Sequence, residues 1–467
     1  MSRQFSRFDT DEFERRVNAE SESGVRLGAY ASREALHYLF LGSHGAFALE
    51  RSRVDGHAAN AVAARFPLFS WDEREMSDEW GVRFSDSPDE RPLRAREGQM
   101  PPALLAAGSG LMHMVVGPVH AGIIEPGRFT FSSGGETVVH LDAQLSYSYR
   151  GVERRLAGMD PLEAAPKVAR ICGGCSASRS LAYAYALEKL AGIEIDPAIE
   201  LARAVVAELE RIYNHLADLA ASASGAGWGP GFARGMALKE RTMRACQAAS
   251  GHRLLFDAIV PGGVGPNTLR DPSALRPELR ELGRAAESYV SSLFGNASVA
   301  SRWKRAGAVS RKMTRAFGAV GPTDRAAGGK VDVRAFASYG AYRELHVNVA
   351  SAANGDAFAR CAVKRDELRE SFRLIDDALA RIGDAPSAAA QALPPFSGNA
   401  IGVVEGPRGA ETIAVHLDER GRLGRVHVVS ASYRNWPIVA RAMDGNIVPD
   451  FPLVNKSFNL CYACADR

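Results

Sequence analysis

Hydrophobic and polar positions change their pattern several times along the 467 residues. Near the start, short apolar runs such as LHYLFLG and GAFALE alternate with polar stretches, and a charged segment with prolines follows, SDSPDERPLRAREGQMPP. From residue 111, apolar positions tend to alternate along LMHMVVGPVHAGIIEPGRFTF and GETVVHLDAQLSYSY, as they do in strands. The pattern therefore predicts a small N-terminal module over residues 1–95, a linker over residues 96–110 and an antiparallel sheet beyond it.

The middle of the chain predicts a helical bundle. Asp196 and Pro197 match an N-cap and a first-turn proline. Apolar residues then recur at helical spacing, at Val205, Val206, Leu209, Ile212, Tyr213, Leu216 and Leu219. A second long helix repeats the pattern at Leu368, Phe372, Ile375, Leu379 and Ile382, and is expected to end at Gly383. Further helices are expected near residues 236–256 and 275–295.

The last part of the chain returns to strands. The segments TIAVHL and RVHVV alternate on either side of DERGRLG, which predicts a hairpin. The whole pattern predicts an α+β fold, with a large helical-bundle domain and a flanking antiparallel sheet over residues 111–467, preceded by a small α+β module.

Composition and charge exclude several classes of protein. A hydrophobic fraction of 46% in so long a chain can build a large core. The net charge of +3 is spread along the chain without a basic face, so nucleic-acid binding is not expected. No uninterrupted apolar run reaches the roughly 18 residues of a membrane span, and the start MSRQFSRFDTDEFERR is too charged for a signal peptide. We therefore expect a cytoplasmic protein.

The cysteines carry the strongest chemical signal. Four of the six form two CxxC pairs, Cys172 with Cys175 and Cys461 with Cys464. Each pair places two sulfur atoms about one helical turn apart, close enough to share an ion, and RICGGCSASRS precedes a helix whose N-terminal dipole favours thiolates. The other two cysteines, Cys246 and Cys361, lie in helical patterns and are expected to be packed core thiols.

Spacing alone leaves four interpretations of the paired cysteines: a structural zinc site, a dithiol redox pair, unliganded core thiols, and a catalytic centre of a soft metal. Zinc ribbons place their pairs about 15 to 20 residues apart, whereas these pairs lie at opposite ends of the main domain. A dithiol redox pair needs one CxxC beside a βαβ unit, and neither pair has that setting. Apolar FPLV and SFNL runs lead into the last pair, so the end of the domain is expected to be buried over a site.

The segments RICGGCSASRSLAYAYALE and SFNLCYACADR together resemble the two cysteine motifs of nickel-iron hydrogenase large subunits. Between them, GPVHAGIIEPGRF, ELERIYNHLADLA and SGHRLLFDAIVPGGVG resemble the complex-I-related branch, of the formate-hydrogenlyase and energy-converting type, and also the quinone-pocket (49 kDa-type) subunit of respiratory complex I. The segment FPLFSWDEREMSDEWGVRFSDSPDERPL resembles the 30 kDa-type subunit of complex I. Complex-I subunits of this fold lack the four cysteines, so the resemblance implies a hydrogenase.

The resemblance also implies a metal-ligand set. By the family pattern, Cys172 and Cys461 are terminal nickel ligands, and Cys175 and Cys464 bridge nickel to iron. Arg408, in VVEGPRGAE, matches the arginine that lies over the open site in this family, where a fixed guanidinium supplies positive charge. The alternative interpretation of Arg408 is an ordinary surface arginine.

Two further side chains are candidates near that site. Glu125, in IIEPG, is the candidate proton carrier, because a carboxylate beside a buried metal can relay protons, and the alternative is a loop carboxylate that faces water. His120, in GPVHAG, matches a histidine of the quinone pocket in complex-I relatives. A lone histidine in such a turn is also a common structural hydrogen-bond partner.

The chain departs from the family pattern at three places. Arg179 replaces the histidine after the first CxxC, Asn459 and Leu460 replace Asp-Pro before the last one, and Arg128 replaces the histidine of EPGHF. Residues that hydrogen-bond to metal ligands change metal affinity or activity by about 10- to 100-fold. We therefore expect these replacements to alter the activity.

The function implied by the resemblance is the reversible conversion of hydrogen into two protons and two electrons at a nickel-iron centre. Only two cysteines remain outside the site, too few for a four-thiolate iron-sulfur cluster. The resemblance therefore implies an iron-sulfur small subunit of complex-I type and membrane subunits that hold the chain on the inner face of the cell membrane. Two alternatives remain: a quinone-linked, NADH-quinone oxidoreductase-type subunit without nickel, and a scaffold subunit with a structural zinc.

Overall fold

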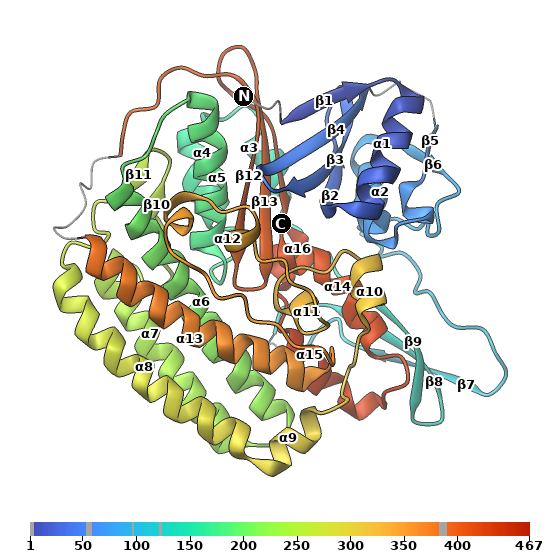
Figure 1. The fold of residues 1–467 in the computed structure, drawn as a ribbon. Coiled ribbons are helices and arrows are strands. Elements are labelled where there is room, and N and C mark those ends of the chain that lie inside the picture. Colours follow the sequence, from blue (N-terminus) through green and yellow to red (C-terminus); the bar gives the residue numbers. More distant parts are fainter. Residues whose placement is uncertain (1–3, 53–57, 96–97, 121–123, 383–389) are drawn as a thin grey trace.

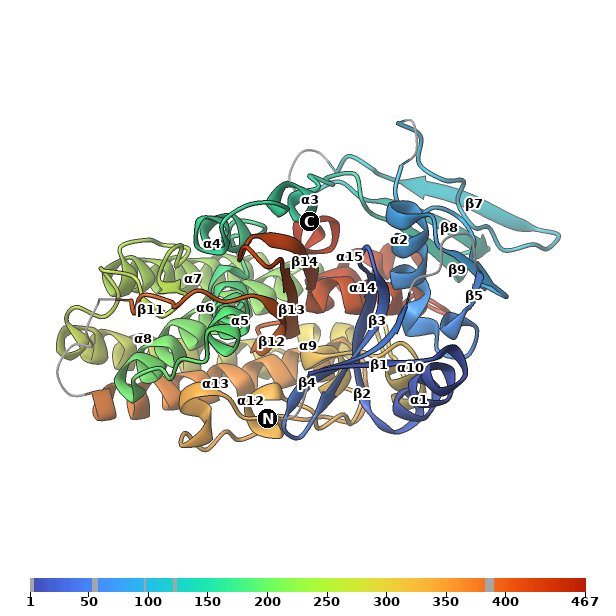
Figure 2. The ribbon, with the colours of Figure 1, turned by 90° about the horizontal axis from the view of Figure 1, so that it is seen from above.

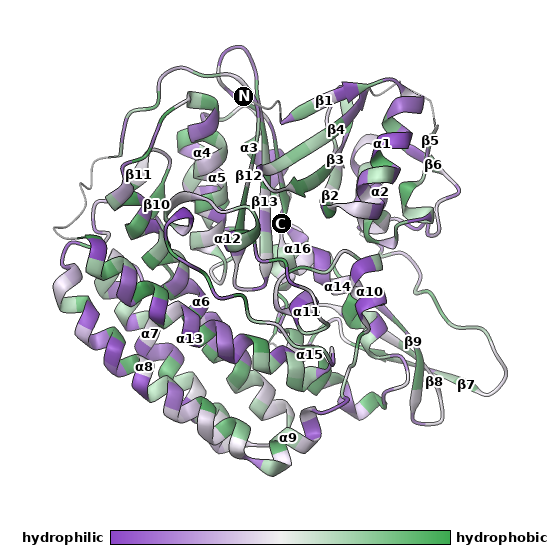
Figure 3. Ribbon diagram, in the orientation of Figure 1, coloured by the Kyte–Doolittle hydropathy of each residue, from purple (hydrophilic) through white to green (hydrophobic). Residues whose placement is uncertain are grey.

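The computed structural model describes residues 4–52, 58–95, 98–120, 124–382 and 390–467. Its largest part is a layer of long helices in which α6 (Pro197–Gly225) packs against α7 (Gly229–Ser250) and α13 (Ala357–Ile382), and α8 (Pro272–Gly295) covers α7 and α13 (Figure 1). Figure 3 shows hydrophilic positions recurring along α8 and α13, as expected for amphipathic helices at a surface.

The long helices largely follow the sequence pattern. The Asp196 carboxylate accepts a hydrogen bond from the Ala198 backbone N–H at 2.8 Å and caps α6, which confirms the predicted start. The helix expected over residues 236–256 is α7, which begins earlier, at Gly229. It also ends earlier, because Gly251 adopts a left-handed φ of 82°. The predicted end of α13 at Gly383 lies outside the described residues.

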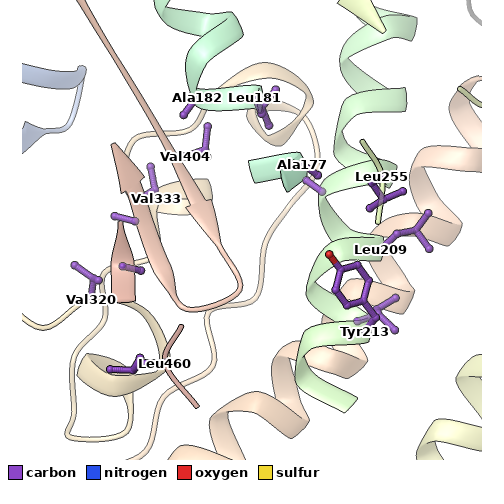
Figure 4. Close-up of a cluster of buried hydrophobic side chains, with 14 of the residues drawn as sticks. Ala177, Leu181, Ala182, Leu209, Tyr213, Leu255, Val320, Val333, Val404 and Leu460 are labelled. Atoms are coloured by element: carbon purple, nitrogen blue, oxygen red, sulfur yellow. The ribbon is translucent and has the colours of Figure 1, made fainter. Parts of the chain in front are cut away.

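A three-stranded antiparallel sheet lies beside the helices. Its strands are β12 (Gly398–Gly406), β13 (Gly409–Leu417) and β14 (Leu423–Val429), and α5 (Ser176–Ala191) packs on β12 and β13. The predicted hairpin is β13–β14, whereas β12 is an additional strand. The backbones of α5 and β12 approach so closely that a Cβ on Gly402 would lie 1.9 Å from the Ala182 carbonyl oxygen. Apolar side chains from α5, α6 and β12 share one core cluster here (Figure 4).

The antiparallel sheet predicted after residue 111 is confirmed. It consists of β7 (Leu111–Val116), β8 (Arg128–Gly134) and β9 (Thr137–Gln144), joined in that order. Phe129 and Phe131 of β8 are buried in the main core, whereas β7 is an exposed edge strand that extends away from the body (Figure 2). The sheet therefore joins the core through one side only.

The N-terminal residues form a four-stranded sheet with the order β1-β4-β3-β2, from β1 (Phe5–Phe8), β2 (Val25–Ala31), β3 (Ala35–Gly42) and β4 (Gly45–Ser52). One face packs on α1 (Thr10–Ser23) and α2 (Ser70–Trp80) in a separate core cluster. On the other face, Tyr30 stacks between His37 and His427, and its hydroxyl lies 2.5 Å from Nε2 of His416. These rings join the sheet to β13 and β14, while the boundary proposed at residue 95 stays a prediction.

The other α-helices and strands of the described chain are β5 (Ala58–Asn60), β6 (Arg83–Ser85), α3 (Val152–Leu156), α4 (Pro161–Ala169), β10 (Ile259–Val260), β11 (Gly263–Val264), α9 (Ala297–Trp303), α10 (Arg311–Ala316), α11 (Gly321–Arg325), α12 (Val333–Phe336), α14 (Ala431–Ala442), α15 (Phe451–Phe458) and α16 (Tyr462–Asp466). Among the residues that the structure describes, no helix has the length and hydropathy of a membrane span.

Buried ion pairs link α6 to its neighbours. The Glu208 carboxylate accepts hydrogen bonds from Nη1 of Arg334 at 2.9 Å, from the Tyr342 hydroxyl at 2.6 Å and from the Ser371 hydroxyl at 2.6 Å. Burial alone would raise the pKa of Glu208, but Arg334 and Arg211 lower it to about 2. The carboxylate is therefore charged at neutral pH and helps to hold α12 and α13 against α6.

Replacing Glu208 with glutamine should lower the free energy of unfolding by about 3–5 kcal/mol at neutral pH, because buried arginines lose their counter-charge. The pKa of the wild-type carboxyl is depressed from 4.5 to about 2 in the folded state. Its contribution is therefore present above pH 4.5 and is lost as the pH falls towards 2. Urea unfolding of both proteins across this range should show the difference shrinking.

The matched control is Glu287→Gln, which breaks an exposed pair with Arg369. Exposed pairs contribute about 0–1 kcal/mol, so this variant should unfold almost like the wild type. A Glu208→Gln deficit that stays constant between pH 4.5 and pH 2, or that equals the control, would contradict the assigned role.

Candidate metal centre

The two CxxC motifs meet in space although 289 positions separate Cys172 from Cys461. The sulfur atoms of these two residues lie 3.2 Å apart, and the sulfur atoms of Cys172, Cys461 and Cys464 all lie within 4.8 Å of one another. Cys175 belongs with them, since its interactions with the thiols of Cys172 and Cys464 raise the pKa of its own thiol. All four cysteines of the motifs therefore form one cluster of thiols.

Within each motif, a backbone N–H donates a hydrogen bond to a cysteine sulfur atom. The Gly174 backbone N–H donates to Sγ of Cys172 at 3.3 Å, and the Cys464 backbone N–H donates to Sγ of Cys461 at 3.3 Å. Cys461 is the N-cap of α16, and Cys175 directly precedes α5. Two thiols of the cluster are thus held by backbone hydrogen bonds within their own motifs.

At the start of α5, the free backbone N–H groups bind a carboxyl group and not the cysteine sulfurs. The first free N–H groups of this helix, on Ala177 and Ser178, donate to the Glu210 carboxylate at 2.6 and 3.0 Å. Burial raises the pKa of Glu210 to about 7, although these hydrogen bonds lower it. The helix start is therefore capped by a carboxyl group of α6 rather than by the cysteine sulfurs.

Residues 461–467 are largely buried, as the apolar runs before them predicted, and only Cys461 and Ala463 among them are partly accessible. The Asp466 carboxylate accepts hydrogen bonds from the Ser146 and Ser148 backbone N–H groups at 2.8 and 2.9 Å. The Ser430 hydroxyl donates to the Cys464 carbonyl oxygen at 2.9 Å. These contacts fix the second CxxC against β14 and the loop after β9.

Arg408 lies over the thiol cluster and is not a surface residue. It occupies the tight turn between β12 and β13, where Nε donates to the Asn459 carbonyl oxygen at 2.6 Å and Nη1 donates to Oδ1 of Asn214 at 3.0 Å. Nη1 also lies 3.7 Å from Sγ of Cys175. Burial alone would lower the pKa of Arg408, but Asp218 and the nearby cysteines hold it above its usual value. The guanidinium is therefore fixed and charged.

Glycine allows the Arg408 turn to sit where it does. Gly321 has a left-handed φ of 64°, and a Cβ on it would lie 2.3 Å from the Arg408 carbonyl oxygen. Any larger residue at this position would push the turn away from the cysteines.

The Asn459 departure has a local structural reason. Asn459 ends α15 in the left-handed region at φ 50°, a conformation that asparagine tolerates better than most residues. Its carbonyl oxygen accepts a hydrogen bond from Nε of Arg408, and its Nδ2 donates one to Oδ1 of Asp218. The replacement thus keeps a polar link between α15, α6 and Arg408.

Arg408 is held by residues of α6 that were not among the predicted site residues. Asn214 and Asp218 lie four positions apart on α6, and Nζ of Lys364 pairs with Asp218 at 2.7 Å. Two polar residues at this spacing within a buried apolar helix face one common direction. The spacing of Asn214 and Asp218 could have indicated a shared polar site. Lys364 could not have been found in this way, because only the fold brings α13 to these residues.

Glu125 contacts a cysteine of the cluster, whereas the hydrogen bond of His120 is to the backbone of its own loop. Oε2 of Glu125 lies 3.8 Å from Sγ of Cys461 and accepts hydrogen bonds from the backbone N–H groups of Tyr462 and Ala463 at 3.1 and 2.9 Å. The side chain is also exposed to solvent. Nε2 of His120 lies 2.8 Å from the Gly127 carbonyl oxygen, which is the geometry of a structural hydrogen-bond partner.

The two arginine departures differ in their distance from the cysteines. Nη2 of Arg179 lies 3.3 Å from Sγ of Cys464 and donates to Oε2 of Glu411 at 3.0 Å. Arg128 begins β8, and its charge lowers the pKa of Tyr147 against the rise that burial causes. Only Arg179 of these two has a described contact with a cysteine of the cluster.

The donor set fits a soft, positively charged metal centre. Hydrogen bonds from Cys175, Cys461 and Cys464 lower the pKa of Cys172 well below its ordinary value, while the bond with Cys172 raises the pKa of Cys175. Four thiols in contact cannot all ionise unless positive charge balances them, and metal ions supply that charge. Arg179 and Arg408 supply part of it on two sides of the cluster.

Two family models match the chain. The model described as "Respiratory-chain NADH dehydrogenase, 49 Kd subunit" matches residues 227–396 and 387–467, and the model described as "Nickel-dependent hydrogenase" matches residues 150–219. The first match covers the second CxxC and Arg408, and the second covers the first CxxC. Together the two models cover residues 150–219 and 227–467 of the chain.

Individual relatives agree with the family models. The chain is 28% identical to formate hydrogenlyase subunit 5 of Escherichia coli over 87% of its own length and 76% of that protein. It is 29% identical to membrane-bound hydrogenase subunit alpha of Pyrococcus furiosus over 75% of its own length and 86% of that protein.

A solved chain of the membrane-bound sulfane sulfur reductase, an archaeal respiratory membrane complex, shares the fold with a TM-score of 0.71 at 24% identity, covering 77% of this chain and 99% of that chain. The chain therefore belongs to the family that unites nickel-iron hydrogenase large subunits of the complex-I-related type with the 49 kDa subunit of respiratory-chain NADH dehydrogenase.

Proposed function

We propose that this chain is the catalytic large subunit of a membrane-associated nickel-iron hydrogenase, which converts hydrogen reversibly into two protons and two electrons. The observation that carries the proposal is the meeting of two distant CxxC motifs in one thiol cluster beneath the fixed guanidinium of Arg408. The hydrogenase names of the relatives support the same activity.

The four cysteines would hold the metals in two roles. Cys172 and Cys461 are proposed as terminal nickel ligands, and Cys175 and Cys464 as ligands that bridge nickel to iron. The burial of the thiols supports this division, because Cys175 and Cys464 are fully buried while Cys172 and Cys461 are partly accessible. When bound, the nickel-iron pair supplies the redox chemistry that splits or forms hydrogen.

Arg408 would shape the space beside the metals. Its guanidinium is held by Asn459, Asn214 and Asp218, so it cannot swing away when a small substrate enters. A fixed positive group in a buried site stabilises developing negative charge without reorganising.

Glu125 is proposed as the first proton carrier. Its carboxylate lies beside Cys461 and also reaches solvent, so one side chain spans the distance between the thiols and the surface. Protons can be passed by a carboxylate that lies within hydrogen-bond reach or one water of the reacting group. The same carboxylate caps the start of α16, which gives it a structural role as well.

Replacing Glu125 with glutamine should slow the exchange of hydrogen gas with deuterated water by about 100-fold and leave the nickel content unchanged. Glutamine keeps an oxygen that accepts the Tyr462 and Ala463 N–H groups, so α16 should stay in place. Mass spectrometry of the gas measures the exchange. Glu136→Gln, in the exposed turn between β8 and β9, is the control, and normal exchange in Glu125→Gln would remove the assignment.

Electrons would leave through another chain. Cys246 and Cys361 are buried in α7 and α13, and burial raises the pKa of Cys361 to about 11, so they are packed thiols as predicted. We therefore propose an iron-sulfur small subunit of complex-I type as the electron partner and peripheral association with a membrane through partner subunits. Exposed apolar side chains on and around β7 support a protein partner there, namely Leu104, Leu105, Met112, Met114, Val115, Val119, Ile124 and Val139.

The alternative function is that of a quinone-linked subunit in which the cysteines hold no nickel. His120 would then be the candidate quinone contact, but its hydrogen bond to Gly127 already explains its position. Hydrogen-dependent reduction of an artificial electron carrier by the purified complex tests the proposal. Quinone-dependent activity in a nickel-free preparation would favour the alternative, and zinc without any turnover would favour a structural subunit.

A further inference from the structure

A buried guanidinium lies behind the proposed bridging ligand Cys464. Arg179 is in the first turn of α5, and its side chain has no exposed surface. Nη2 lies 3.3 Å from Sγ of Cys464 and 3.0 Å from Oε2 of Glu411. Because an arginine stays protonated in proteins, a full positive charge lies against this sulfur atom.

Glu411 competes with Cys464 for that charge. It lies on β13 and is buried, and its second oxygen, Oε1, accepts a hydrogen bond from the Ala431 backbone N–H at 3.1 Å at the start of α14. The carboxylate is therefore fixed through the oxygen that does not bind Arg179. One nitrogen of the guanidinium is shared between a carboxylate and a thiol, so any loss of charge on one acceptor changes how strongly the other is bound.

We propose that Arg179 and Glu411 act as a pair of positioning residues that set the electron-donor strength of the Cys464 thiolate and hence the reduction potential of the metal centre. The inference rests on the proposed function, because it takes Cys464 as a metal ligand. Hydrogen bonds and positive charge at a ligating sulfur favour the more reduced, more negative state of a metal centre. Arg179 therefore raises the potential, and Glu411 offsets part of this effect.

The replacement of the family's histidine by Arg179 changes the charge beside the Cys464 sulfur. A histidine at this position can be neutral, whereas arginine cannot, so the replacement adds a permanent charge beside the sulfur. In a buried site such a charge acts at low effective dielectric and is not screened by salt. The carboxylate of Glu411 supplies the counter-charge that the replacement requires.

The test is a redox titration of the nickel signal by electron paramagnetic resonance, carried out on the complex with its partner subunits. Arg179→Gln should lower the midpoint potential, and Glu411→Gln should raise it, each by about a tenfold change in the ratio of oxidised to reduced centres, or about 59 mV for one electron. The double variant should lie near the wild type. A residue with only a structural role would not shift the potential in opposite directions.

The matched control is Glu188→Gln. Glu188 also pairs with a buried arginine, Arg203, but at the far end of α5, and it should leave the potential unchanged. Nickel content is measured in every sample. Nickel-free wild-type protein would overturn the proposed function and this inference with it. Nickel-loaded variants with wild-type potentials would overturn the inference alone. If Arg179→Gln loses nickel, Glu411→Gln decides, since an upward shift supports the pair and an unchanged potential refutes it.

Discussion

Replacing Cys461 with alanine should leave the purified complex without nickel and lower its hydrogen turnover by at least about 10⁴-fold, to the uncatalysed background. Cys461 is the N-cap of α16, and its sulfur lies 3.2 Å from that of Cys172. Alanine removes one of four soft donors and opens the cluster on its partly accessible side. Nickel is measured by elemental mass spectrometry, and turnover by hydrogen-dependent reduction of a dye.

The fold should survive this change. Asp466 and Ser430 hold residues 461–467 against the rest of the chain, and these contacts persist when the Cys461 sulfur and the hydrogen bond that it accepts from the Cys464 backbone N–H are lost. The matched control is Cys246→Ala, which removes a buried thiol of α7 that lies outside the cluster. It should keep nickel and turnover at a modest cost in stability, of about 1 kcal/mol. Nickel retained in Cys461→Ala, or lost in Cys246→Ala, would refute the ligand assignment.

Replacing Arg408 with lysine should lower hydrogen turnover by about 10²- to 10³-fold while nickel stays bound. The guanidinium makes directed bonds to the Asn459 carbonyl oxygen at 2.6 Å and to Oδ1 of Asn214 at 3.0 Å, with Asp218 at 3.6 Å. A lysine ammonium keeps the charge but cannot hold this fork-shaped set of partners, so the charge loses its fixed position. The thiols are untouched, so metal binding should persist.

This prediction separates an electrostatic role from a structural one. Arg276→Lys is the control, because Arg276 pairs with Asp376 on the surface between α8 and α13 and should be neutral for turnover. Wild-type turnover in Arg408→Lys would show that charge alone suffices. Loss of nickel in that variant would show instead that Arg408 supports the cluster itself.

The helical bundle could be predicted because its signals are local. Asp196 and Pro197 mark the start of α6, and an apolar residue recurs every three or four positions after them. The N-terminal sheet gave no comparable signal, because β2 and β3 are buried on both faces and show no alternation. Likewise, β12 could not be recognised from GNAIGVVEG, whose glycines serve close packing against α5.

The sequence predicted that the two cysteine pairs share a site, but not what surrounds them. Their spacing left four interpretations, and the resemblance to hydrogenase large subunits supplied the proposed ligand roles and Arg408. The partners of Arg408 come from α6, α13 and α15, and Glu411 comes from β13, so only the folded chain brings them together. The sequence also gave no sign that Glu210 of the neighbouring helix accepts the first free N–H groups of α5.

The most direct test of the account is the metal content of the wild-type protein, purified with its partner subunits, as nickel, iron and zinc per chain by elemental mass spectrometry. A nickel-iron centre at the four thiols requires about one nickel per chain, bound with iron and retained through a chelator wash. Zinc in the place of nickel, or a cluster without metal, would contradict it.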